Sequence, residues 1–193
     1  MQKTNDLLSS YVYDLANPDQ LVQLVKGYWA KKGIKINQDK TVAPFTAYVN
    51  AVAVSQTSIQ FNFPDGTFGT TSGGVSGSTY PDSEHMLIVG IRVLQGASAT
   101  LALSPWVQGV ADPNILNGRM TLNNNGTIAL KDVPLSRFPV STGNADLDGG
   151  YYQLDQPIAW VGQTSLFVNV AIPTATAVAN TNLRMELVGI KLI

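Results

Sequence analysis

Cysteine is absent from this chain of 193 residues, and His85 is its only histidine. Without cysteine the chain can form neither disulfides nor thiolate metal sites, and a single histidine cannot supply a cluster of zinc ligands. The glycines between residues 66 and 77 are followed by neither the lysine nor the helix of a phosphate-binding loop. We therefore expect the chain not to be an enzyme, to use no cofactor, and to have no catalytic, cofactor-binding or metal-binding residues.

Charge is also scarce. Charged residues make up 13% of the sequence, about half of the usual share, and the formal net charge is -1. Binding to a nucleic-acid backbone needs clustered lysines and arginines, and the nearest approach to a cluster is the set Lys26, Lys31, Lys32, Lys35 and Lys40. We expect no direct sequence-specific binding of nucleic acid. With 45% hydrophobic residues, the low charge favours a surface that neighbouring subunits cover.

Long apolar runs are missing as well. A transmembrane helix needs about 18 or more consecutive apolar residues, and we expect no transmembrane segment because the sequence contains no such run. The first residues, MQKTNDLLSSYVYDL, lack the cationic and apolar regions of a signal peptide. We therefore expect a protein that is made in a reducing interior.

The most informative stretch that is present occurs twice. HMLIVGIRVL, residues 85–94, is matched by RMELVGIKLI, residues 184–193, when the two are aligned on Gly90 and Gly189. Both are apolar on both faces of an extended strand, which is typical of strands that are covered on both sides. We expect neighbouring central strands of one sheet, whose core faces carry Leu87, Val89, Ile91 and Val93 in the first and Val188, Ile190 and Leu192 in the second.

Residues 4 to about 32 are expected to be helical, in two pieces. The second piece begins with Asn17 as N-cap and Pro18 at the first helical position, and Gly33 ends it after two lysines. Apolar residues recur at helical spacing between them, up to Tyr28 and Trp29. The helix either packs on the sheet of its own subunit or inserts its Tyr28 and Trp29 edge against another subunit.

The rest of the chain has the pattern of strands. TAYVNAVAV (46–54) and SIQFNF (58–63) come first, and a loop rich in Gly, Ser and Thr follows at 64–84. From residue 85 we expect about eight strands with no helix between them. They include ATLALSPW with Leu101 and Leu103 inward, a hairpin turning at Asn125 and Gly126, the pair YYQLD and IAWVG, and SLFVNVAI with Leu166, Val168, Val170 and Ile172 aligned. In the hairpin, Met120, Leu122, Ile128 and Leu130 are expected on the apolar side.

This pattern predicts a mainly β fold, a single eight-stranded antiparallel jelly-roll sandwich with a short helical N-terminal extension. We divide the chain into an extension at 1–45 and a sandwich domain at 46–193. An immunoglobulin-type sandwich is the main alternative, but the Cys, Trp, Cys core pattern of antibody domains is absent.

One polar segment has the spacing of a calcium loop. Asn144, Asp146, Asp148, Gly149 and Asp155 fall at positions 1, 3, 5, 6 and 12 of that template. The template begins with Asp and ends with a bidentate Glu, whereas this segment begins with Asn and ends with Asp. Because Asn, Asp and Gly are also the common residues of turns, we favour an ordinary polar loop.

A helical N-terminal extension, an insertion rich in Gly, Ser and Thr, about eight strands, no cysteine and low charge together resemble the jelly-roll capsid and other virion structural proteins of viruses, bacteriophages included. The resemblance implies a self-assembling capsid component, either major, penton or minor, whose partners are copies of itself and other virion proteins. It implies a location in the virion after assembly in the host cytoplasm. Many such coat proteins carry an arginine-rich arm that binds the genome, and this N-terminus has none.

The alternative is a carbohydrate- or receptor-binding β-sandwich module of a phage tail or surface structure. In that case exposed Trp and Tyr side chains would stack on sugar rings, and Asn and Asp would bind hydroxyls. For subunit contacts we expect outward-facing side chains, and the candidates are Phe167, Trp160, Trp106 and Tyr151, or Tyr28 and Trp29 of the helix.

Overall fold

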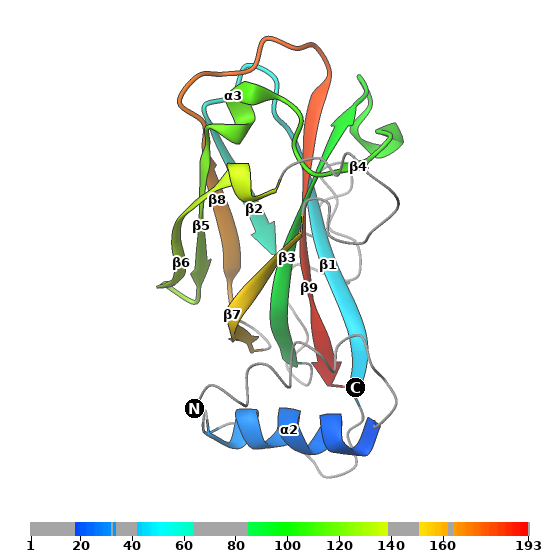
Figure 1. Ribbon diagram of the computed structural model, residues 1–193, viewed down its shortest axis with the longest axis vertical. Coiled ribbons are helices and arrows are strands. Elements are labelled where there is room, and N and C mark those ends of the chain that lie inside the picture. Colours follow the sequence, from blue (N-terminus) through cyan, green and yellow to red (C-terminus); the bar gives the residue numbers. More distant parts are fainter. Residues whose placement is uncertain are drawn as a thin grey trace.

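A computed structural model describes residues 18–31, 33, 42–63, 85–138, 151–161 and 164–192. Within these ranges nine strands form two antiparallel sheets, and an α-helix lies across one end of them (Figure 1). Four expected features lie outside the described residues. They are the first helical piece, the N-cap Asn17, the loop at 64–84, and Asn144, Asp146, Asp148 and Gly149 of the calcium-loop pattern.

The larger sheet has five strands. It consists of β1 (Val42–Val52), β9 (Thr181–Leu192), β3 (His85–Ala97), β4 (Val107–Gln108) and β7 (Tyr151–Trp160). Strand β9 lies between β1 and β3, and both β7 and the short β4 pair with β3 on its other side. The two segments that repeat one another in sequence, β3 and β9, are therefore neighbouring antiparallel strands in the interior of one sheet, as predicted. We call this sheet the large sheet.

The smaller sheet, which we call the small sheet, has four strands in the order β2-β8-β5-β6. Its strands are β2 (Ser58–Phe63), β8 (Leu166–Ala171), β5 (Arg119–Asn124) and β6 (Thr127–Pro134). The large and small sheets enclose one hydrophobic core, to which Val49, Ile88 and Met185 contribute from the first and Phe61 and Val168 from the second. The predicted mainly β sandwich is confirmed.

The strand pairs are nested along the chain. Strand β1 pairs with β9, β2 with β8, β3 with β7, and β5 with β6. From the outermost pair to the innermost, successive pairs alternate between the large sheet and the small sheet. Strand β1 begins at Val42, so residues 42–45, which we expected in the helical extension, are part of the large sheet.

A β-bulge in β3 decides which residues face the core. Ile88 pairs with Gly189 and Gly90 with Val188, so Val89 is an extra residue on β3. One extra residue reverses the alternation of side chains beyond it. The core side of β3 therefore carries Met86, Ile88, Ile91 and Val93, and that of β9 carries Leu183, Met185 and Leu187.

The predicted core face was thus right for the second half of β3 and wrong for its first half and for β9. Leu87, Val89 and Ile190, which we expected in the core, are buried without belonging to it. Val188 is half-buried, and the side chain of Leu192 is outside the described part of the chain.

Both glycines of the repeat lie where a side chain has no room. A Cβ atom added at Gly189 would be 2.9 Å from the carbonyl carbon of Leu87 and closer still to its oxygen. A Cβ added at Gly90 would overlap the phenol of Tyr151. The obstacle is backbone in one case and a side chain in the other.

Several local predictions were wrong. Residues Leu101–Leu103 form a 3₁₀ turn, η1, and Leu103 is 75% exposed instead of inward. A short helix that we did not expect, α3 (Pro113–Leu116), begins where the Asp112 carboxylate accepts a hydrogen bond from the Asn114 amide. A second 3₁₀ turn, η2, spans Leu135–Arg137. YYQLD and IAWVG do not pair with each other, because residues 151–160 form the single strand β7, which pairs with β3.

The predicted hairpin and the predicted strand β8 are confirmed. Asn125 and Gly126 have left-handed φ angles of 49° and 78° and connect β5 to β6, as an Asn-Gly turn requires. Met120 and Leu122 are buried, but Ile128 is 54% exposed, so the apolar side of β6 was only partly predicted. All four aligned residues of the SLFVNVAI segment, Leu166, Val168, Val170 and Ile172, are buried.

The helix α2 (Pro18–Lys31) covers one end of the sandwich (Figure 1). Its Trp29 is fully buried, with its ring centroid 5.4 Å from that of His85 at the start of β3. Tyr28 donates a hydrogen bond from its hydroxyl to the Pro157 carbonyl oxygen at 2.7 Å, and burial raises the pKa of Tyr28. Of the two alternatives for this helix, packing on its own subunit is the one observed. No helix in the described ranges is long and apolar enough to span a membrane.

Candidate functional site

The outer face of the large sheet carries a group of charged and aromatic side chains. Tyr48 pairs with Glu186 across β1 and β9, Asn50 pairs with Arg184, and Glu186 pairs with Arg92 across β9 and β3. Residues directly opposite one another on paired strands point to the same side of the sheet. Their chain neighbours Val49 and Met185 face the core, so these five side chains point away from it.

Arg184 lies between two aromatic rings. Its Cζ atom is 4.3 Å from the ring centroid of Tyr48 and 4.5 Å from that of Trp106. Its Nε donates a hydrogen bond to Asn50 Oδ1 at 2.8 Å, which fixes the plane of the guanidinium. Burial lowers the pKa of Arg184, and the nearby Glu186 and Tyr48 act in the opposite direction. The arrangement is a rigid cation–π stack, with the planar cation held in one orientation.

Glu186 joins this stack to a second arginine. Its Oε2 is 3.1 Å from Arg92 Nη1 and its Oε1 is 3.9 Å from Arg184 Nη1. The side chains are only 20% exposed for each arginine and 10% exposed for Glu186. Arg92 in turn lies over the ring of Tyr151, with 5.8 Å from its Cζ to the ring centroid. Two arginines and one glutamate give this face a formal charge of about +1, which the low exposure concentrates in a small area.

Trp106 reaches this face because the segment before it folds back over the sheet. Asn182 of β9 donates hydrogen bonds from its side chain to the carbonyl oxygen of Ser98 at 2.8 Å and to Ser104 Oγ at 2.7 Å. Gly96 makes this approach possible, since a Cβ atom there would be 2.8 Å from Ser104 Cβ and 3.1 Å from the Trp106 ring. A buried asparagine and a glycine thus position the tryptophan.

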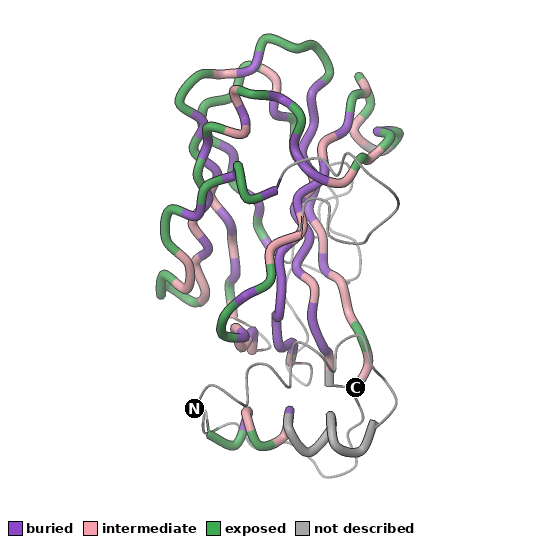
Figure 2. The backbone as a smooth tube through the Cα atoms, in the orientation of Figure 1, coloured by how far each residue is buried: buried purple, intermediate pink, exposed green. Residues whose placement is uncertain are grey.

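Exposed aliphatic side chains gather at the end of the sandwich next to this stack. Among the described residues five large hydrophobic side chains are exposed, and four of them are Val52, Leu103, Val107 and Val178, at 49%, 75%, 54% and 59%. Val52 pairs with Asn182, and Leu103 precedes the Ser104 that Asn182 binds. Figure 2 shows several exposed residues along the segment of η1 and β4. We call these four residues the apolar rim.

The candidate contact residues are distributed differently from our expectation. Trp106 and Tyr151 lie on the charged and aromatic face, and Phe167 is half-buried on the outer face of the small sheet between Asn62 and Asn123. Trp160 and Trp29 were wrong candidates, because both side chains are fully buried. Trp160 donates its Nε1 hydrogen to the Thr164 carbonyl oxygen at 3.1 Å inside the subunit.

Four important residues of the face were not predicted from the sequence: Tyr48, Arg92, Arg184 and Glu186. One local signal was available, since Arg184 and Glu186 are two residues apart in a strand and must share a face. The Tyr48 and Arg92 side chains come from other strands. Only the register of β1 and β3 against β9 brings them to the same place.

The segment with calcium-loop spacing, for which we favoured an ordinary polar loop, lies almost entirely outside the residues that the structure describes. Of its five residues only Asp155 is described, and it is an exposed residue of β7. Within the described ranges no group of three or more His, Asp or Glu side chains is close enough to hold a metal ion.

No protein-family model matches this chain, and no curated protein matches it.

Proposed function

We propose that this chain is a structural subunit of a virion shell, a capsid component that assembles through contacts between copies of itself and with other virion proteins. Its role is geometric and not catalytic. The observation that carries the proposal is the apolar rim beside the Arg184 stack. Protein interfaces are enriched in Trp, Tyr and Arg and have an apolar centre. Here the exposed Val52 lies on the same side of the large sheet as Tyr48, Trp106 and two arginines, and the other exposed aliphatic side chains of the rim lie at the same end of the sandwich.

We further propose that the sandwich is a jelly roll. A jelly roll is an antiparallel ribbon of eight strands, rolled so that successive strand pairs fall in alternate sheets. The nested pairs β1–β9, β2–β8, β3–β7 and β5–β6 support this topology, with β4 as a short addition to the large sheet. Jelly rolls are common in viral capsids but also in lectins and cupins, so the topology alone does not select the function.

The composition supports a shell subunit as well. A charged fraction of 13% with 45% hydrophobic residues is unusual for a freely diffusing monomer, whose surface is kept soluble by charge. Shell subunits cover much of their surface with neighbours. We place the protein in the virion after assembly in the host cytoplasm, with the genome bound by other components, because the sequence has no dense cluster of lysine and arginine.

The test is the mass of the purified chain by light scattering behind size exclusion at micromolar concentration. We expect an oligomer or a larger particle, and negative-stain electron microscopy would then distinguish a closed shell from a small oligomer. A wild-type chain that elutes as a monomer would overturn the proposal.

A pair of matched variants tests the surface. Val107→Glu places a charge in the apolar rim, where burial by a neighbour would be strongly unfavourable, so we expect smaller species or monomers. Ile128→Glu is the control, since Ile128 is also 54% exposed and also lies in a strand, far from the rim (Figure 1). If both variants assemble like the wild type, the rim is not the contact surface.

A further inference from the structure

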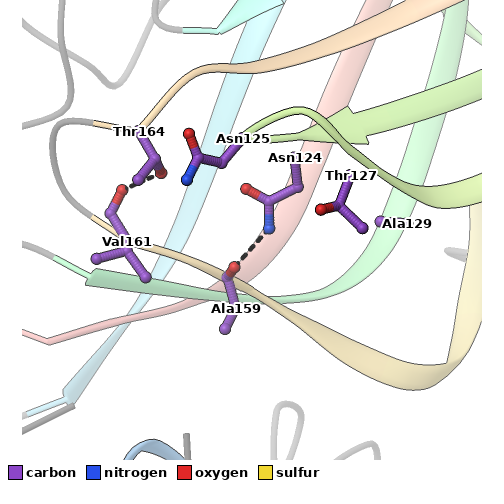
Figure 3. Close-up of a pocket in the computed structure, with 7 residues that line it drawn as sticks. All are labelled: Asn124, Asn125, Thr127, Ala129, Ala159, Val161 and Thr164. Atoms are coloured by element: carbon purple, nitrogen blue, oxygen red, sulfur yellow. Dashed lines mark hydrogen bonds between the residues drawn. The ribbon is translucent and has the colours of Figure 1, made fainter. Parts of the chain in front are cut away.

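A small hollow opens where the β5–β6 turn faces the end of β7 (Figure 3). Its volume is about 300 Å³, at the lower end of the range for ligand pockets. One wall comes from the turn and carries Asn124, Asn125 and Thr127; the other comes from β7 and the residues after it and includes Val161 and Thr164.

Hydrogen bonds hold both walls in place. Asn124 donates from its side-chain Nδ2 to the Ala159 carbonyl oxygen at 2.7 Å. The backbone N–H of Asn125 donates to the Ser165 carbonyl oxygen, also at 2.7 Å. Thr164 donates from its hydroxyl to the Val161 carbonyl oxygen at 2.5 Å. The Asn124 bond connects the turn of the small sheet to the end of β7 in the large sheet, and the other two hold each wall locally, so the hollow is built before any ligand arrives. Preorganisation of this kind reduces the entropy that binding has to offset.

Several polar groups in the hollow are left over after this bonding. Among the described residues, the Asn125 side-chain amide and the Thr127 hydroxyl have no hydrogen-bond partner, and Asn124 Oδ1 accepts no bond. Figure 3 shows the Asn124 and Asn125 amides extending toward the wall that carries Val161 and Thr164. An amide offers both donors and an acceptor, as a hydroxyl does. Two such amides side by side match a ligand with adjacent hydroxyl groups.

The rest of the lining is small, apolar and uncharged. Ala129, Ala159 and Val161 supply aliphatic surface, and none of the described lining residues is ionisable. A charged ligand would leave water for a site that has no counter-charge, which is unfavourable. A sugar ring has hydroxyl groups at its edge and C–H groups on its face, and it can use both kinds of surface.

We propose that this hollow binds one ring of a neutral carbohydrate. The ring's adjacent hydroxyls would bond with the amides of Asn124 and Asn125 and with the Thr127 hydroxyl, while its C–H face lies on the small aliphatic side chains. The site differs from the stacking on Trp and Tyr that the sequence suggested, since the lining residues that the structure describes include no aromatic side chain. It is independent of subunit assembly.

Saturation-transfer difference NMR tests the proposal, because it reads the ligand's signals whether the protein is a monomer or a particle. The probes are the methyl glycosides of glucose, galactose and N-acetylglucosamine at millimolar concentration. We expect saturation transfer to at least one of them, and in Asn125→Gly a dissociation constant that rises about tenfold. Glycine accepts the left-handed φ of 49° at this position, so the turn is retained.

Asn180→Gly is the matched control. Asn180 is also exposed and also has a left-handed φ, of 62°, but it lies in the loop before β9. We expect it to bind the sugar like the wild type, and Thr127→Val to weaken binding about threefold. Absence of transfer to all three glycosides, or equal binding by the Asn125→Gly and Asn180→Gly proteins, would overturn the inference. A monomeric protein that binds the sugar would retain it while the shell proposal fails.

Discussion

Strands β3 and β9 have nearly the same sequence pattern but use it differently. Before the shared glycine the two strands agree: Met86 and Ile88 of β3 face the core, as do Met185 and Leu187 of β9. After the glycine they differ, because Ile91 lies in the core whereas Ile190 is buried on the outer side, where it pairs with Leu87. The bulge at Val89 is the cause. A pattern of residue types specifies a strand, but one unpaired residue decides which face each side chain joins.

The cations that follow the glycines show the same divergence. Arg92 of β3 joins Glu186 on the outer face at 3.1 Å. Lys191 of β9 has its Nζ 5.2 Å from the ring centroid of Phe45, a residue that packs against the core. The bulge therefore supplies the outer face of the large sheet with an arginine that an unbroken alternation would have turned inward.

The largest effect is expected from Gly189→Ala. The new Cβ would collide with the backbone of Leu87 in the adjacent strand, and backbone in the middle of a sheet cannot move aside without loss of pairing. We expect the free energy of unfolding to fall by about 3 kcal/mol or more in chemical denaturation. The control is Gly27→Ala in α2, where nothing lies within 4 Å and alanine should stabilise the helix slightly. Similar losses in both variants would contradict this account.

Gly90→Ala is expected to have a smaller effect, although the motif is the same. Here the obstacle is the Tyr151 phenol, a side chain on the outer face that can rotate away. We expect a loss of about 1 to 2 kcal/mol. In a Tyr151→Ala background the same substitution should be nearly neutral, so a double-mutant cycle measures the clash directly. An unchanged cost in that background would mean that the backbone and not the ring excludes a side chain at residue 90.

The smallest difference is expected between the two cations. Arg92→Met leaves Glu186 on a poorly exposed face with Arg184 as its remaining cation, at 3.9 Å, and should lower the free energy of unfolding by about 1 to 2 kcal/mol. Lys191→Met should lower it by less, because the contact of a cation with an aromatic ring at a partly exposed site contributes about 0.5 to 1 kcal/mol. Equal losses would show that the bulge gives Arg92 no special environment.

Elements with local causes were predicted well from the sequence. The helix α2 begins at Pro18 and ends at Lys31, where the proline and the Gly33 signal had placed its limits. The Asn125–Gly126 turn and the alternation of β8 were also correct, since a turn dipeptide and a period of two act over a few neighbouring residues. Two predictions failed because strand formation depends on pairing with a distant segment. Residues 101–103 form a 3₁₀ turn instead of a strand, and both parts of β7 pair with β3 instead of with each other.

The candidate sites were much less predictable. The Arg184 stack combines Tyr48, Trp106 and Arg184 from three distant parts of the chain, and the hollow combines a hairpin turn with a strand end of the opposite sheet. Composition indicated a surface that is poor in charge, and aromatic residues indicated candidates for contact. Neither could tell the half-buried Trp106 on the outer face from the fully buried Trp160.

The sequence by itself determined that this chain is mainly β, where the helix α2 and the Asn125–Gly126 turn lie, and that two matching segments are central strands, because capping, turn angles and alternation are local properties. Tertiary structure alone decided the nested order of the strand pairs and the bulge that reverses the alternation of side chains in β3. It also decided which side chains meet on the outer face of the large sheet. These depend on hydrogen bonds between strands far apart in the chain. Register against a partner, and not residue type, therefore sets which way each side chain points.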